Sequence, residues 1–334
     1  MESNEASEKK PSDGAESKSR EADWLTVLFF IHIHLLAVYG GWMVFNEAKF
    51  LTSIFLFFLV FLAFLGVTTG AHRLWCHHTY KASTALKIFL MLCQTLAGQG
   101  PIYDWVKHHR FHHAHFGTEI DPYNHKKGFV YAHFITRLRN LSKYQKARLE
   151  EIDMKDLEED KVVMFQKKYY WVLYAIVFLL LPINAPLEYW GDSPLSIVFV
   201  IGFFRYFLVL HMSWLVDSAI SVWGLKPGDR YPPDTNLVFI INPSFWPKYH
   251  YLFPQDYKSG EYGTYDAGVG TAFIRVWAAL GMATDLITAE ATTVQAALTE
   301  STKTNRPILT CLNEAVAKQR LDPDHFLQRT KQLM

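Results

Sequence analysis

The sequence has little charge and no surplus of either sign. Charged residues make up 19% of its 334 residues, against 50% hydrophobic and 16% aromatic residues, a composition too apolar for an ordinary soluble enzyme of this length. The formal net charge is +1, so no excess of lysine and arginine exists to neutralise phosphates, and we expect no nucleic acid partner. The composition therefore favours a membrane protein.

Cysteine is scarce, and the N-terminal region has no apolar run. The three cysteines, Cys76, Cys93 and Cys311, have no Cys-x-x-Cys spacing, which favours neither a disulfide framework nor a zinc ribbon and suits a reducing, cytosol-facing environment. Residues 1–22 are rich in serine, glutamate, lysine and aspartate. They predict a disordered polar leader rather than a signal peptide.

Long apolar runs are what the sequence does have. Four of them are close to the roughly 20 residues that a helix needs to cross a bilayer, and they lie at about 24–45, 51–69, 169–190 and 195–215. A shorter run at 85–97 is below spanning length and predicts a helix at the interface or packed on the rest of the protein. We expect an all-α fold with four transmembrane helices.

The distribution of positive charge predicts the orientation in the membrane. The segment 71–168 contains sixteen lysines and arginines, whereas the turn at 184–194 contains none. Because positively charged loops stay in the cytosol, we expect the long segment and both termini on that side. Segments 71–168 and 224–263 are then expected to form a helical cytosolic cap, and 264–334 a helical cytosolic tail.

Histidines gather directly after the second apolar run. Eight of the fifteen lie between residues 72 and 115. On a helix, His109, His112 and His113 share one face, so their rings can converge on a metal. His72 and His77 are five residues apart, about 140° round a helix, so they either serve two different ions or stand where the helix ends.

The location of these histidines narrows the choice of metal. Imidazole binds iron, copper, zinc and nickel alike. A histidine site at the end of membrane spans faces a lipid-derived substrate, and removing hydrogen from an unactivated methylene requires dioxygen activated by a redox-active metal, which excludes zinc. We therefore expect iron.

The histidine strings and several others resemble one enzyme family. The strings are His72-Arg73-Leu74-Trp75 followed by His77, Asp104-Trp105-Val106 ahead of His109-Arg110 and His112-His113, Asp121-Pro122 with Asn124, Trp214-Leu215-Val216, and Phe253-Pro254 with Asp256-Tyr257-Lys258. In this combination the chain resembles the animal membrane acyl-CoA desaturases of the stearoyl-CoA desaturase type. The resemblance covers residues 23–263, which we interpret as a desaturase domain.

The resemblance implies a function and a site. It implies a multi-pass protein of the endoplasmic reticulum membrane that introduces a cis double bond into a long-chain saturated acyl-CoA, using dioxygen and electrons from cytochrome b5. In that family nine histidines and one asparagine surround two irons. Lys107 and Trp105 are expected to bind the substrate. No general acid or base is assigned, and the ligands carry over onto His72, His77, His109, His112, His113 and His250.

The second half of the site departs from the family pattern. Ser221, Pro247 and Tyr251 stand where the family has histidines, and Asp217 stands where it has the asparagine. Three outcomes are open. Asp217 can serve as a carboxylate ligand in a rearranged site that His250 and Tyr251 complete. One iron can bind weakly, with slow turnover, or the fold can bind lipid or regulate a partner without chemistry. A hydroxylase with the same ligands is a further alternative.

Overall fold

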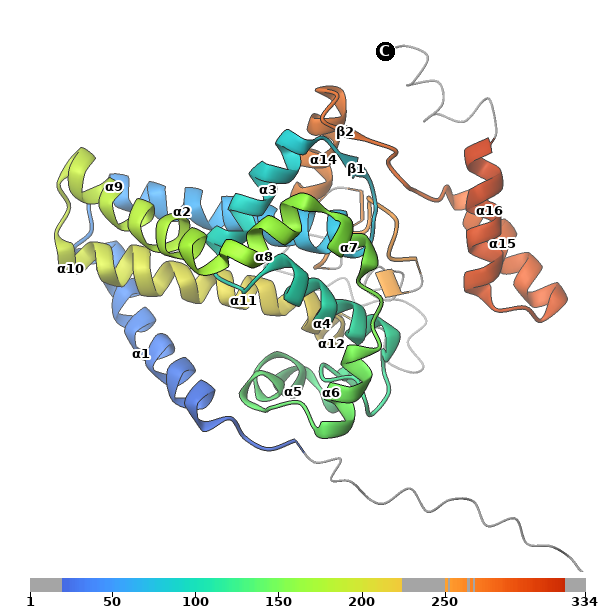
Figure 1. Cartoon of the computed structure of the whole chain (residues 1–334), viewed down its shortest axis with the longest axis horizontal. Coiled ribbons are helices and arrows are strands. Elements are labelled where there is room, and N and C mark those ends of the chain that lie inside the picture. The colour runs from blue at the N-terminus through green and yellow to red at the C-terminus, as the bar shows by residue number, and fades with distance from the viewer. Residues whose placement is uncertain (1–19, 224–249, 252, 263–264, 267, 322–334) are drawn as a thin grey trace, which may run out of the picture.

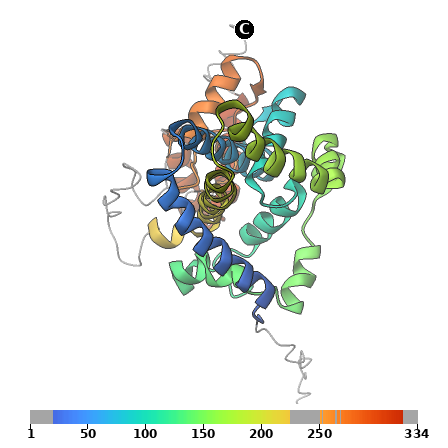
Figure 2. The ribbon, with the colours of Figure 1, turned by 90° about the vertical axis from the view of Figure 1, so that its left-hand side faces the viewer.

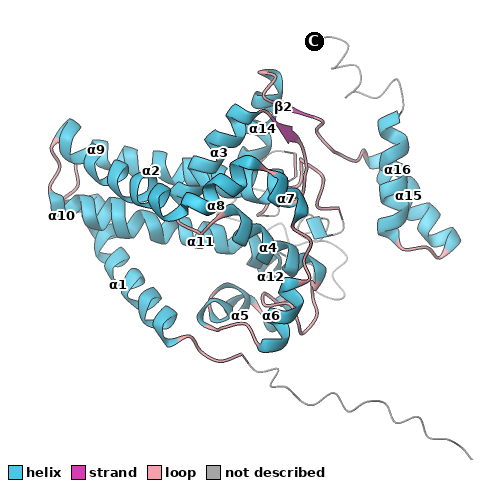
Figure 3. Ribbon diagram, in the orientation of Figure 1, coloured by secondary structure: helices cyan, strands magenta, loops and turns pink. Residues whose placement is uncertain are grey.

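The computed structural model describes residues 20–223, 250–251, 253–262, 265–266 and 268–321. Within these residues helices dominate, and the strands present are a two-residue antiparallel pair, β1 (Lys81–Ala82) with β2 (Ala283–Thr284) (Figure 3). Most of the predicted leader and of the predicted cap segment 224–263 lies outside the described residues, as does Pro247.

In the part of the chain that the structure describes, four helices are long and apolar enough to cross a membrane. The first is α1 (Trp24–Asn46), and the second is α2 (Phe50–Leu65) continued by the π-helical η1 (Gly66–Cys76). The third joins α8 (Lys161–Leu173), η4 (Tyr174–Leu180) and α9 (Leu181–Trp190), and the fourth joins α10 (Pro194–Ser196), η5 (Ile197–Phe204) and α11 (Arg205–Ser218). The predicted all-α fold with four spans is confirmed, and the protein is a multi-pass membrane protein.

Two spans are longer than the apolar runs that predicted them. The second continues beyond residue 69 to Cys76 and so carries His72 on the same continuous helix. The third is preceded by a helical stretch that begins at Lys161, where the Asp160 side chain accepts hydrogen bonds from the first backbone N–H groups of α8. A kink with non-helical backbone at Tyr169, the predicted start of the span, joins this stretch to the rest. Both extensions are helical segments that contain polar residues, so hydropathy alone does not predict them as part of the spans.

The spans form an elongated bundle, with α1 crossing the fourth span obliquely (Figures 1 and 2). The two helices approach closely at Gly40, where an added Cβ would lie 2.3 Å from the carbonyl oxygen of Phe199. Large apolar side chains face outward along the spans, among them Leu25, Phe45 and Trp171, each more than three-quarters exposed. This outer surface suits the hydrocarbon of a lipid bilayer.

Two non-spanning helices pack on one end of the bundle. Helix α3 (Thr84–Ala97), capped by the Ser83 side chain, matches the short apolar run expected to pack on the protein. It lies against η1 at Gly66, where an added Cβ would be 2.2 Å from the backbone nitrogen of Gln94. Helix α4 (Ile102–Ala114) follows and carries the second histidine string.

The remaining helices of the described residues are short or belong to the C-terminal part. They are η2 (His125–Lys127), α5 (Phe129–His133), η3 (Ile135–Leu138), α6 (Lys143–Glu150), α7 (Lys155–Glu159), α12 (Ile220–Trp223), α14 (Val269–Ala279), α15 (Ala291–Thr304) and α16 (Ile308–Leu321). The main core joins the end of the second span to α3, α4 and α14 through residues such as Leu74, Leu86, Val106 and Ile274. This packing fixes the two histidine-bearing helices relative to each other.

Candidate metal centre

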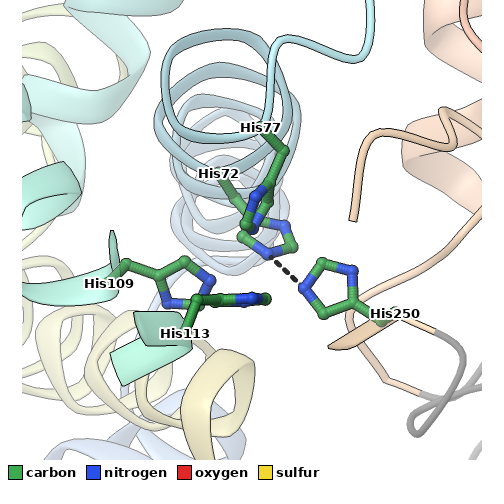
Figure 4. Close-up of side chains that lie close together, drawn as sticks. All are labelled: His72, His77, His109, His113 and His250. Atoms are coloured by element: carbon green, nitrogen blue, oxygen red, sulfur yellow. Dashed lines mark hydrogen bonds between the residues drawn. The ribbon is translucent and has the colours of Figure 1, made fainter. Parts of the chain in front are cut away.

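Five histidines form one compact group where the second span meets α4. They are His72, His77, His109, His113 and His250, and one ring nitrogen from each lies within 4.8 Å of those of the others. Figure 4 shows the five rings facing a common centre, two from the end of the second span, two from α4 and one from the C-terminal half of the chain. Four of the five are buried, and His113 is partly buried. We call this set the five-histidine group.

Local helix geometry brings the first four rings together. Helix η1 is π-helical, and the backbone N–H of His77 at its end donates to the carbonyl oxygen of His72, five residues earlier, at 3.1 Å. This wide turn brings the two rings together, with centroids 4.7 Å apart, and accounts for their spacing of five residues. On α4, His109 and His113 are one turn apart, with ring centroids separated by 4.7 Å.

Several ring nitrogens of the group are buried without any hydrogen-bond partner among the described residues. They are Nε2 of His77, His109 and His113 and Nδ1 of His250. Burial, with the neighbouring histidines, lowers the pKa of His109 to about 4 and those of His77, His113 and His250 well below their usual value. The rings are therefore neutral and offer lone pairs, the form of imidazole that binds a metal ion.

Carboxylates hold two of these rings from behind. The Nδ1–H of His72 donates to Glu261 Oε1 at 2.9 Å, and that of His109 donates to Asp217 Oδ1 at 2.7 Å. With Nδ1 engaged, Nε2 of each ring points to the centre of the group. Metal-binding histidines usually make such a hydrogen bond from the ring nitrogen that does not bind the metal. Burial alone would raise the pKa of Glu261, but Arg73 and His72 hold it well below its usual value, so it stays ionised.

Each carboxylate is in turn bound by an arginine. Arg73 donates from Nε and Nη2 to the two oxygens of Glu261, at 2.7 and 2.9 Å. Arg137 donates from Nη2 to Asp217 Oδ2 at 2.5 Å. The sequence had not singled out Glu261, which lies 189 residues from His72. The one indication in the sequence is Arg73, which follows the predicted ligand His72. A buried arginine there requires a buried counter-charge.

His112 lies outside the five-histidine group. Its Nδ1 is 2.7 Å from Asp121 Oδ1, and its Nε2 is 2.8 Å from the hydroxyl of Tyr251. The Tyr251 ring stacks on Phe116, with centroids 3.7 Å apart, and on His113 at 4.8 Å. Burial raises the pKa of Tyr251 well above its usual value, so its hydroxyl keeps its proton and donates it to His112.

The remaining predicted site residues are dispersed around the group. The indole of Trp105 stacks on His109 at 5.0 Å, and its Nε1 donates to Ser213 Oγ at 3.4 Å. The ammonium of Lys107 lies farther out, 2.6 Å from Glu150 Oε2. The Oγ of Ser221 is buried and has no partner within the part of the chain that the structure describes.

Comparison with known proteins decides the family. No family model matches the chain, but individual proteins do. It is 43% identical to the acyl-CoA Delta-9 desaturase of Acheta domesticus, over 83% of this chain and 78% of that protein. It is 36% identical to the stearoyl-CoA desaturase of Homo sapiens, over 78% of this chain and 73% of the relative. The chain belongs to the acyl-CoA desaturase family.

Not every related desaturase is named for the same position on the acyl chain. The acyl-CoA Delta12-desaturase of Acheta domesticus is 40% identical over 80% of this chain and 76% of that protein. The family therefore includes desaturases named for different positions on the acyl chain. The family resemblance implies iron, and the five-histidine group fits one such ion, because it supplies convergent nitrogen donors. The Nε2 atoms of His77, His109 and His113 have no partner among the described residues. His72 Nε2 lies 3.2 Å from His250 Nε2 (Figure 4), a hydrogen bond that a bound metal would replace.

Proposed function

We propose that the protein is an iron-dependent acyl-CoA desaturase of the endoplasmic reticulum membrane. It would introduce a cis double bond into a long-chain saturated acyl-CoA, with dioxygen as oxidant and cytochrome b5 as electron donor. The observation that carries the proposal is the five-histidine group, buried at the end of a membrane span in a chain of this family. The orientation with both termini in the cytosol follows from the positive charge of segment 71–168.

The overall reaction balances with these reactants. Two hydrogens leave adjacent carbons of the acyl chain, and two electrons from the donor and two protons complete the reduction of one dioxygen to two waters. Iron bound at the group supplies the redox chemistry that no side chain offers. The contribution of the chain is to hold the imidazoles in place through Glu261 and Asp217 and to position the substrate beside them.

The acyl chain is expected to lie between the second and fourth spans. Apolar side chains such as Val67 and Met212 meet there and leave no room for even a water molecule. Ser213, at the same contact, accepts the hydrogen bond of Trp105, whose indole stacks on His109. Small-molecule sites usually enclose roughly 300–1,000 Å³, so these side chains must move to admit the substrate.

The coenzyme A head is expected to lie on the cytosolic side of α4. Lys107 provides a cation there, but it is paired with Glu150 at 2.6 Å. A phosphate would have to compete with that carboxylate, and an ammonium binds it as a point charge without the two-pronged geometry of arginine. Membrane lipid would surround the exposed apolar faces of the spans.

Purified protein reconstituted with cytochrome b5, its reductase, dioxygen and stearoyl-CoA tests the proposal. Gas chromatography with mass spectrometry should reveal a cis-monounsaturated product. His113→Ala should abolish it, whereas His108→Ala should retain it, because His108 is outside the group and its Nδ1 bonds the Asp104 carbonyl on its own helix. A hydroxylated product, or no product from iron-loaded protein, would refute desaturation.

A second candidate, a lipid-binding or regulatory membrane protein without catalysis, is favoured by one observation. His112 and Asp217, both expected near the metals, are engaged with Tyr251 and Arg137. Iron content separates the two candidates. Folded protein that takes up no iron when iron is supplied would support the second and eliminate the first.

A further inference from the structure

We propose that this protein holds one metal ion where its family resemblance implies two, because the side chains expected around a second ion are bound to one another and to Arg137. The inference rests on the proposed function only in placing a metal at the five-histidine group. It concerns the four described positions of the family pattern that lie outside that group, which we call the second-ion positions: His112, Asp217, Ser221 and Tyr251.

His112 has no lone pair free for a metal. Its Nδ1 faces the buried carboxylate of Asp121 at 2.7 Å and so carries the ring proton. Its Nε2 lone pair then accepts the hydroxyl proton of Tyr251 at 2.8 Å. Because the Tyr251 ring is packed between Phe116 and His113, the hydroxyl cannot leave without breaking both stacks. This hydrogen bond takes the place of a metal–nitrogen bond.

Both carboxylate oxygens of Asp217 also accept hydrogen bonds within the protein. One carboxylate oxygen accepts from His109 and the other from Arg137. Arg137 is itself anchored, since its Nη1 donates to the hydroxyl of Tyr123 at 2.9 Å and its guanidinium lies over the Tyr123 ring at 4.2 Å. A fixed cation at this point neutralises the carboxylate and repels a second metal ion.

The arrangement around Asp217 repeats the one around Glu261. In both, a histidine of the five-histidine group donates to a carboxylate that an arginine binds from the other side: His72, Glu261 and Arg73 in one case, His109, Asp217 and Arg137 in the other. By this parallel, Asp217 orients His109 for the first ion. Its carboxylate is then not free to bind a second ion. Ser221 adds only a neutral hydroxyl.

Iron counting on the full-length protein in detergent tests the inference. The expected result is about one iron per chain, with an electron paramagnetic resonance signal in the oxidised state from an isolated ferric ion. Two irons per chain with a silent oxidised state, as in an antiferromagnetically coupled pair, would overturn the inference and leave the proposed function intact. Protein that binds no iron would overturn both, and one iron without acyl-CoA oxidation would overturn the proposed function alone.

A restored variant tests whether the named side chains set the number of ions. It combines Asp217→Asn, Ser221→His, Pro247→His and Tyr251→His with Arg137→Ala, and we expect its iron content to rise from about one to about two per chain. Iron content that stays at one in this variant, folded and membrane-inserted, would contradict the inference. His113→Ala in the natural sequence is the matched control and should lose its single ion.

Discussion

The ion pair of Glu261 and Arg73 makes a prediction that separates stability from metal binding. Both side chains are buried, at 3% and 2% exposure, and Glu261 also accepts from His72. In Glu261→Gln the amide keeps the shape but leaves the Arg73 charge uncompensated, and breaking a buried pair in this way costs about 3–5 kcal/mol. Because His72 loses its carboxylate, iron affinity should also fall about 10- to 100-fold.

The double variant Arg73→Met, Glu261→Met distinguishes the two effects. Removing both charges abolishes the uncompensated cation, so the double variant should recover most of the stability lost by the single change. Iron affinity should stay low in both, because His72 lacks its carboxylate in each. Thermal unfolding in detergent micelles measures the first quantity, and competition with a coloured chelator measures the second.

Glu314→Gln serves as the control for this pair of variants. Glu314 pairs with Arg306 on the exposed surface of the C-terminal helices, and exposed ion pairs contribute little to stability. If Glu261→Gln lowers stability no more than Glu314→Gln does, the buried ion pair does not stabilise the fold as proposed. If the double variant regains full iron affinity along with its stability, Glu261 does not orient His72 for the metal.

Three further predictions follow from the site. The pKa of His109 is lowered to about 4 from an ordinary 6.5, so the unfolded chain binds the proton at a higher pH than the folded chain does. The metal-free protein should therefore lose about 3 kcal/mol of stability as the pH falls from about 6.5 to 4. A stability that does not change over this pH range would contradict this. Trp105→Ala, which removes the indole stacked on His109, should lower product formation roughly 10- to 100-fold at unchanged iron content; loss of iron instead would make its role structural. Gly66→Ala forces a Cβ into the backbone at Gln94 and should lower the free energy of unfolding by about 1–3 kcal/mol. The unfolding temperature measures this loss, and an unchanged unfolding temperature would show that α3 can shift freely.

The four spans could be predicted because apolar length is a local property of the chain. Their ends could not, because Lys161 begins a polar turn that Asp160 caps, and Cys76 ends a polar continuation of the second span. Hydropathy marks the residues that can face lipid. A helix, however, continues for as long as its backbone N–H and C=O groups have hydrogen-bond partners. The extension to Cys76 matters for function, since it carries His72 to the metal centre.

The histidines of the site were predictable to the extent that one helix places them. His109 and His113 are one turn apart on α4, so their spacing alone brings them together. No sequence pattern indicates that Tyr251, 139 residues along the chain, binds His112. Nor does any pattern show that Arg137 binds Asp217, because contacts between distant segments depend on how the spans pack.

Iron X-ray absorption spectroscopy on the purified protein measures whether the five-histidine group binds iron. The expected spectrum shows a coordination shell dominated by imidazole nitrogen, with outer-shell scattering from about five rings and no iron–iron vector. A shell in which oxygen or sulfur predominates would contradict the assignment of the group as the iron site. A clear iron–iron vector would contradict the single ion.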